Sequence, residues 1–327
     1  MDDDRLDDEL ARRIRASLAH LGNDMPASPP IRSPRRSVGV LRAAAAVVVL
    51  ALVAVTVVLF VQSDDEVSAV TPGLLRFDPI DEGAAELLER AATAALAAGD
   101  DLSDGGVLYV QAETWDLDAD FIGEAKNVAM TAIVEESWTD RTGAGRRELR
   151  PGRTLEPGEV GGVFVPPDTA GEATVEAPIS GLNVEQHGAV PDDADAIVTL
   201  ETLGIGSDDQ TELLQALAGL LRREPFDAAQ KAALWRSIGA IDGLEVLGST
   251  TDRFGREAVG VALTGRSTGV ETQTIFLFDP ATATALATEE VLTGDSRALD
   301  IPTPALVGYH VLVDSVVVDS VGTRPQD

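Results

Sequence analysis

The chain has 327 residues, a formal net charge of −30, 44% hydrophobic residues and no cysteine. This length is enough for one or two domains with a substantial core. The acidic balance argues against a nucleic-acid surface, which needs clustered lysine and arginine. The absence of cysteine excludes disulfides, zinc–cysteine and iron–sulfur sites, thiol catalysis and a lipidated cysteine.

The N-terminal residues predict an amphipathic helix over residues 6–21. Acidic residues stand at its start and arginines follow, an order that complements the helix dipole. A helix this short is marginal alone in water. We therefore expect its apolar stripe to dock a partner such as a transcription regulator, or else to lie on the inner leaflet or stay mostly disordered. The stripe consists of Leu6, Leu10, Ile14, Leu18 and Leu21. A linker rich in proline, serine and arginine continues to residue 42.

Residues 43–61 predict a transmembrane helix. They read AAAAVVVLALVAVTVVLFV, without a charge and with Thr56 as the one polar residue. A helix of this length spans about 28 Å, close to the roughly 30 Å of a hydrocarbon core. The alternatives are a buried core helix, which would show a polar stripe, and a cleavable signal peptide, which would be shorter and nearer the N-terminus. We therefore expect an uncleaved anchor.

The charges beside this segment predict its orientation. Arginines precede it at positions 32, 35, 36 and 42, whereas Asp64, Asp65 and Glu66 follow it. The positive-inside rule places the N-terminus in the cytoplasm. Residues 1–42 hold eight arginines and seven acids, and the rest of the chain holds 17 basic and 48 acidic residues. Nearly all of the negative charge is thus expected outside the cell.

The remaining residues predict a connector over 62–80 and an acidic α+β domain over 81–327. Helices are expected over 81–99, where alanine and leucine dominate and Gly99 ends the helix, from about 207 to 223, and from Pro225 to about 241. The last of these begins with an Asp227–Gln230 capping pair. Residues 151–205 are expected to be mostly loop with brief strands.

Alternating apolar and polar residues predict strands around and after these helices. Expected strands cover 106–115, 127–140, 146–150, 244–250, 257–264, 272–279, 284–292 and 308–322. Turns at Asp252–Gly255 and at residues 279–282 join the later strands as hairpins. Strands with clustered helices indicate a curved antiparallel sheet packed on helices.

Two segments of the chain resemble an actinobacterial family of single-pass membrane proteins. They are ESWTDRTGAGRREL and the stretch from PFDAAQKAALWRSIGAIDGLEVLGSTTDRFGREAVGVAL to IFLFDPATATALATEEV. The resemblance implies an outer domain similar to lipoprotein-carrier folds and, because members are often encoded beside extracytoplasmic-function sigma factors, a sigma factor as partner. It implies no functional residues. The tail departs from a typical anti-sigma domain, because it lacks a zinc motif and is too short for a helical bundle.

No pattern in the sequence predicts a catalytic, cofactor or metal site. The three histidines, His20, His187 and His310, stand far apart, and His310 is expected to be a half-buried strand residue. Asp116, Asp118 and Asp120 resemble the opening of a calcium loop but lack its glycine and final glutamate, so surface acid is the better interpretation. The three tryptophans, at positions 115, 138 and 235, are expected to be core or sheet-face residues.

These observations favour a non-enzymatic, membrane-tethered sensor or regulator. Its outer domain is expected to bind a ligand or partner, and its tail to contact a cytoplasmic regulator. The alternative is an envelope lipid-binding or scaffolding protein whose tail serves only as an anchor. The two differ in whether the tail has a specific protein partner.

Overall fold

The computed structural model describes residues 71–99, 102, 106–122, 125–151, 175–179, 188–267, 270–294 and 301–325. All of these belong to one compact unit, Ala69–Asp327. The predicted tail helix and transmembrane segment lie outside the described residues. Within those residues, no helix is both long and apolar enough to cross a membrane.

Nine strands form a single sheet in which every neighbouring pair is antiparallel. Their order across the sheet is β4-β3-β2-β1-β9-β8-β7-β6-β5. The strands are β1 (Val107–Ile122), β2 (Ala125–Thr139), β3 (Gly145–Pro151), β4 (Val175–Ile179), β5 (Glu245–Thr251), β6 (Glu257–Ser267), β7 (Val270–Asp279), β8 (Thr284–Leu292) and β9 (Ala305–Val318).

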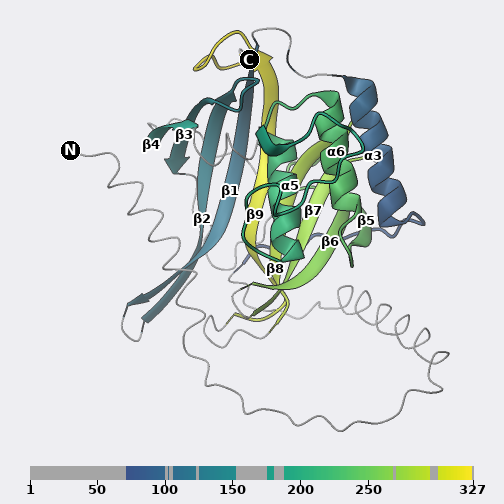
Figure 1. Cartoon of the computed structure of the whole chain (residues 1–327). Coiled ribbons are helices and arrows are strands. Elements are labelled where there is room, and N and C mark those ends of the chain that lie inside the picture. The colour runs from purple at the N-terminus through teal and green to yellow at the C-terminus, as the bar shows by residue number, and fades with distance from the viewer. Residues whose placement is uncertain are drawn as a thin grey trace, which may run out of the picture. The chain divides into compact units, whose positions relative to one another are not determined.

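The sheet consists of two meanders that meet in its middle. Strands β1 to β4 follow one another on one side, and β5 to β9 follow one another on the other. The meanders are joined by the pairing of β1 with β9, the first and last strands of the sheet along the chain. Figure 1 shows both long strands side by side in the middle of the sheet.

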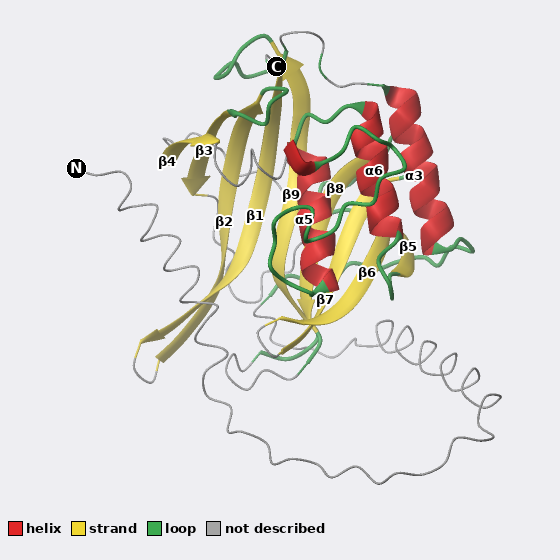
Figure 2. Cartoon of the chain, viewed as in Figure 1, coloured by secondary structure: helices red, strands yellow, loops and turns green. Residues whose placement is uncertain are grey.

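Three helices cover one face of the β5–β8 half of the sheet (Figure 2). They are α3 (Ala84–Ala98), α5 (Gln210–Arg223) and α6 (Ala228–Gly239). Helix α5 lies on β6, β7 and β8, and α6 packs between α3 and α5. The side chain of Asp209 accepts a hydrogen bond from the Thr211 backbone at the start of α5, and Asp227 and Gln230 form the predicted capping box of α6.

The helix face of the sheet carries the larger core. Trp235 of α6 is fully buried and lies against Phe276 and Phe278 of β7, with ring centroids 5.5 and 4.9 Å apart. Leucines of α3 and α5 fill the space around these rings. Alternate residues of β6 and β7 point to this face because side chains alternate along a strand, which is the pattern that the sequence predicted.

The opposite face carries a second core, closed by residues 71–80. Leu74, Leu75 and Phe77 pack against it, and Asp78 forms a backbone bridge with Ser249 of β5. Gly260 of β6 is required beneath Phe77, because a Cβ atom there would lie 2.4 Å from the ring. The sequence assigns residues 71–80 to a connector, whereas in the structure they form part of the folded unit.

The α+β class and the antiparallel sheet are confirmed. Helix α3 lies within the predicted range and ends at Gly99, whose φ is 79°. All three tryptophans are buried as expected. Strand β1 is longer than predicted, because it continues through the acidic run after Trp115 to Ile122. That run therefore has an extended backbone, unlike the turn of a calcium loop.

Candidate functional site

The two central strands β8 and β9 separate partway along their length. Their last paired residues are Ala287 and Val311. Strand β8 extends beyond this pair to Thr284, and β9 extends beyond it to Val318. Over the described residues, this outer part of β9 pairs with β1 alone. We call the wedge between the two separated strand ends the fork.

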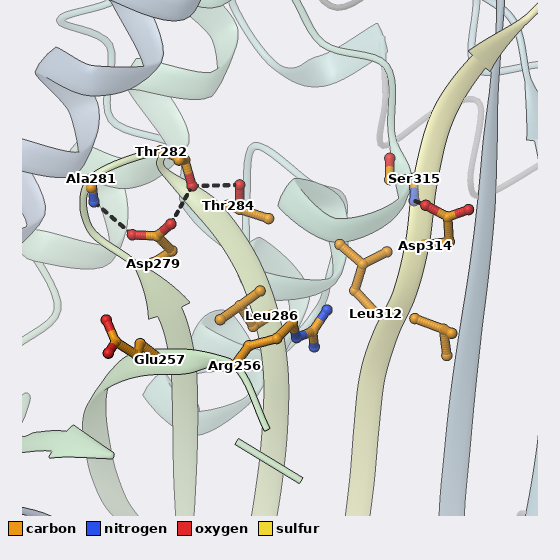
Figure 3. Close-up of a pocket in the computed structure, with 11 residues that line it drawn as sticks. Arg256, Glu257, Asp279, Ala281, Thr282, Thr284, Leu286, Leu312, Asp314 and Ser315 are labelled. Atoms are coloured by element: carbon orange, nitrogen blue, oxygen red, sulfur yellow. Dashed lines mark hydrogen bonds between the residues drawn. The ribbon is translucent and has the colours of Figure 1, made fainter. Parts of the chain in front are cut away.

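The fork contains a cavity of about 650 Å³ (Figure 3). One wall belongs to β9, and the other belongs to the start of β8, the β7–β8 turn and the start of β6. Leu286 and Leu312 face the space between the walls (Figure 3). The lining residues are Arg256, Glu257, Asp279, Ala281, Thr282, Thr284, Leu286, Leu312, Val313, Asp314 and Ser315.

The β7–β8 turn is held by Asp279. Its Oδ1 accepts the backbone N–H of Ala281 at 2.8 Å, and its Oδ2 accepts the hydroxyl of Thr282 at 2.7 Å. The hydroxyls of Thr282 and Thr284 lie 2.8 Å apart. This is the side-chain-to-backbone pattern that favours aspartate at a turn, and it fixes hydroxyl groups along one wall of the fork.

The β9 wall bends where a bulge inserts Val313 between Leu312 and Asp314. The Oδ1 atom of Asp314 accepts the backbone N–H of Ser315 at 2.8 Å. Beyond it, Val316 and Val317 are each 37% exposed. This part of the strand therefore exposes two valine residues to solvent.

The fork has an excess of negative charge. The guanidinium of Arg256 donates to Asp252 Oδ2 at 2.7 Å, so that its charge is already paired. Glu257, Asp279 and Asp314 leave the lining acidic. No histidine or lysine is among the lining residues.

Polar groups also gather on the helix face at the base of the fork. The Nδ1 atom of His310 lies 3.0 Å from the hydroxyl of Thr114, and Arg222 at the end of α5 donates to the hydroxyl of Thr288 at 3.0 Å. Burial, followed by the charge of Arg223, lowers the pKa of Arg222 to about 9. Burial and the nearby arginines lower the pKa of His310 to about 3. His310 is therefore neutral at physiological pH and has the half-buried strand position that the sequence predicted.

Two carboxylates flank Gly308 on the same face. A Cβ atom built on Gly308 would lie 3.6 Å from Asp116 Oδ1 and 3.7 Å from Glu290 Oε2. Desolvation raises the pKa of both carboxyl groups, and the charge of Asp116 raises that of Glu290 further. In the described part of the chain, no group of three or more metal-ligating side chains has the geometry of an ion site.

The opposite face holds a buried ion pair beside the second core. Arg253 contacts Glu289 through two hydrogen bonds of 2.7 and 3.2 Å, and it also donates to the carbonyl of Gly73 at 3.0 Å. Its guanidinium lies over the Tyr309 ring, which stacks on Trp115. The pair thus joins the segment before α3 to the centre of the sheet.

The sequence did not predict the fork. The predicted docking residues Leu6, Leu10, Ile14, Leu18 and Leu21 lie outside the described residues, as do His20 and His187. The sequence offers one signal of the fork, which is the difference in length between two predicted strands. The last predicted strand continues past Val311 through a valine-rich segment, whereas the predicted strand that corresponds to β8 is only nine residues long. Strand length alone gives no pairing partner, so the separation required the structure.

No family model, curated protein or solved structure matched this chain. The resemblance to actinobacterial single-pass proteins therefore stays a prediction.

Proposed function

We propose that this protein is a non-enzymatic, membrane-tethered sensor or regulator whose α+β domain binds a ligand or partner at the fork. In this proposal residues 43–61 anchor the chain with its N-terminus in the cytoplasm. The amphipathic segment 6–21 docks a cytoplasmic regulator, for which a sigma factor is the first candidate.

The observation that carries the binding proposal is the fork itself. Strands β8 and β9 pair with each other over the rest of their length but separate at the cavity, so that strand ends which no longer pair with each other line its two walls. The carboxylate of Asp279 and the hydroxyls of Thr282 and Thr284 are held in place by hydrogen bonds to one another and to the turn backbone, so one wall presents fixed polar groups. Ligand sites are usually preformed and concave.

The test is crosslinking in native membranes followed by capture of the full chain. We would compare the intact protein, a version lacking residues 1–30, and the single variants Ile14→Asp and Ala16→Asp. Ile14 lies on the apolar stripe and Ala16 lies on the opposite side of the predicted helix, so the two variants add the same charge to different faces.

Recovery of one transcription regulator with the intact protein and Ala16→Asp, but not with the other two, would support the proposal. The same recovered set from all four proteins would refute the regulatory part. It would favour an envelope lipid-binding or scaffolding protein whose tail is an anchor extension.

A further inference from the structure

We propose that the fork binds an extended peptide carrying basic side chains, which adds as a strand to the open edge of β9. This inference rests on the proposed function and deepens it, because it names the class of ligand for the same site. It follows from the pairing of the strands, from the side chains on the open edge and from the charge of the cavity.

The open edge of β9 is long enough to pair with a peptide. Residues 312–318 extend beyond the last pair with β8, which at about 3.4 Å per residue gives roughly 24 Å of strand. In an antiparallel ladder, alternate residues direct their N–H and C=O groups to opposite sides. About half of these backbone groups therefore point away from β1 and into the fork, where an added strand would satisfy them.

The outer end of the edge lacks the features that usually prevent such pairing. Natural sheet edges are protected by charged side chains, prolines or bulges. Here the bulge at Val313 and the charge of Asp314 stand at the inner end of the edge, whereas the outer end reads Ser-Val-Val-Val. Valine favours strands strongly, and Val316 and Val317 are exposed. An exposed edge of this composition is suited to bind another strand.

The charge of the fork determines the peptide class. Glu257 and Asp279 lie on one wall and Asp314 on the other, whereas Arg256 is paired with Asp252. A peptide between the walls would direct alternate side chains to opposite faces of the sheet. Lysine or arginine side chains of such a peptide would meet carboxylates on both walls of the fork.

The first experiment measures fluorescence anisotropy of a labelled peptide with the full chain in detergent. The probe is a capped heptapeptide of alternating valine and lysine. Two matched peptides serve as controls: one has methyl groups on alternate backbone nitrogens, and the other has glutamate in place of lysine. We expect the lysine peptide to bind at least tenfold more tightly than either. Equal binding of the N-methylated peptide, or of the glutamate peptide, would overturn the inference.

Protein variants then locate the site. Ser315→Pro places a residue without a backbone N–H in the edge, which weakens strand pairing, and we expect at least tenfold weaker binding. Proline in a strand can disturb folding, so a double variant, Glu257→Lys with Asp314→Lys, tests the same site through its charge. We expect this double variant to bind the glutamate peptide more tightly than the lysine peptide. Glu201→Lys, at an exposed position outside the fork lining, is the matched control. Unchanged lysine-peptide binding by the double variant would place the peptide elsewhere and refute the proposal.

The two proposals fail in different ways. Capture of a regulator through the tail, with no peptide preference, overturns the peptide inference alone. Peptide binding at the fork without any tail-dependent partner supports this inference and overturns the regulatory part of the proposed function.

Discussion

At the scale of single residues, Glu113 is a buried acid in the middle of the sheet. It lies in the middle of β1 between Val134 and Val311, its side chain is completely buried, and neither carboxylate oxygen has a hydrogen-bond partner. Burial raises the pKa of Glu113 to about 8. The native state therefore holds this carboxyl group protonated at neutral pH, since an isolated buried charge is costly.

This gives a prediction for Glu113→Gln. In the unfolded wild-type chain the Glu113 carboxyl group loses its proton near pH 4.5. In the folded state it keeps the proton up to about pH 8. The free energy of unfolding should therefore fall across this window, by about 3 kcal/mol between pH 5 and pH 8 relative to the glutamine variant. Urea unfolding of the full chain in detergent, followed by tryptophan fluorescence, measures this. All three tryptophans are buried in the described domain.

Glu86→Gln is the control, because Glu86 is exposed on α3. Its pH profile should follow that of the wild type. If the unfolding free energy of Glu113→Gln instead changes with pH in the same way as that of the wild type, Glu113 is solvated or paired in solution.

The second residue-scale prediction concerns Gly260. An added Cβ would lie 2.4 Å from the Phe77 ring, so Gly260→Ala should lower the free energy of unfolding by about 2 kcal/mol. Phe77→Leu in the same chain should recover part of this loss, because the smaller side chain relieves the clash. Additive losses in the double variant would show that residues 71–80 do not pack on β6.

At the scale of elements, local patterns predicted most helices and strands but not how they meet. Helix α6 was predicted from its Asp227–Gln230 cap and apolar stripe, and the β7–β8 hairpin was predicted from its Asp-Pro turn. The pairing of β1 with β9 joins residues about 200 positions apart, and no local pattern specifies such a partner. The buried pair of Arg253 and Glu289 was missed for the same reason, since each residue alone looks like surface charge.

The segment after β9 is a further element that only tertiary contacts define. Trp138 donates its indole N–H to the carbonyl of Thr323 at 2.6 Å, and Arg324 contacts Glu136 through bonds of 2.7 and 3.0 Å. Burial alone would raise the pKa of Glu136, but hydrogen bonds from Arg324 and Tyr109, with the charges of Arg324 and Arg150, hold it below the usual value.

Arg324→Ala should therefore lower the free energy of unfolding at pH 7 by about 2 kcal/mol. The ionised Glu136 contributes stability above the pKa that it has in the unfolded chain, and this stability is lost as the pH falls through its lowered pKa in the folded state. The difference in unfolding free energy between the wild type and Arg324→Ala should therefore shrink towards pH 3. Urea unfolding at both pH values measures this, and Arg324→Lys should show an intermediate loss. A difference that persists at pH 3 would indicate lost packing on Trp138 instead of a lost ion pair.

At the scale of the whole molecule, the distribution of charge and the absence of cysteine make the proposed membrane orientation directly testable. Arginines precede residues 43–61 and acids follow them, so the tail should stay in the cytoplasm while the acidic domain lies outside. Single cysteines can be introduced without background labelling, because the chain has none. Ser28→Cys marks the tail, and Glu201→Cys marks an exposed position of the domain.

We expect a membrane-impermeant maleimide to label Glu201→Cys in intact spheroplasts, and to label Ser28→Cys only after the membrane is opened with detergent. The reverse pattern would invert the orientation and place the fork in the cytoplasm. Labelling of both sites in intact spheroplasts, with the protein released by carbonate washing, would show that residues 43–61 do not anchor the chain. The expected pattern would place the acidic fork where extracytoplasmic basic peptides can reach it, with the tail on the side where a transcription regulator is found.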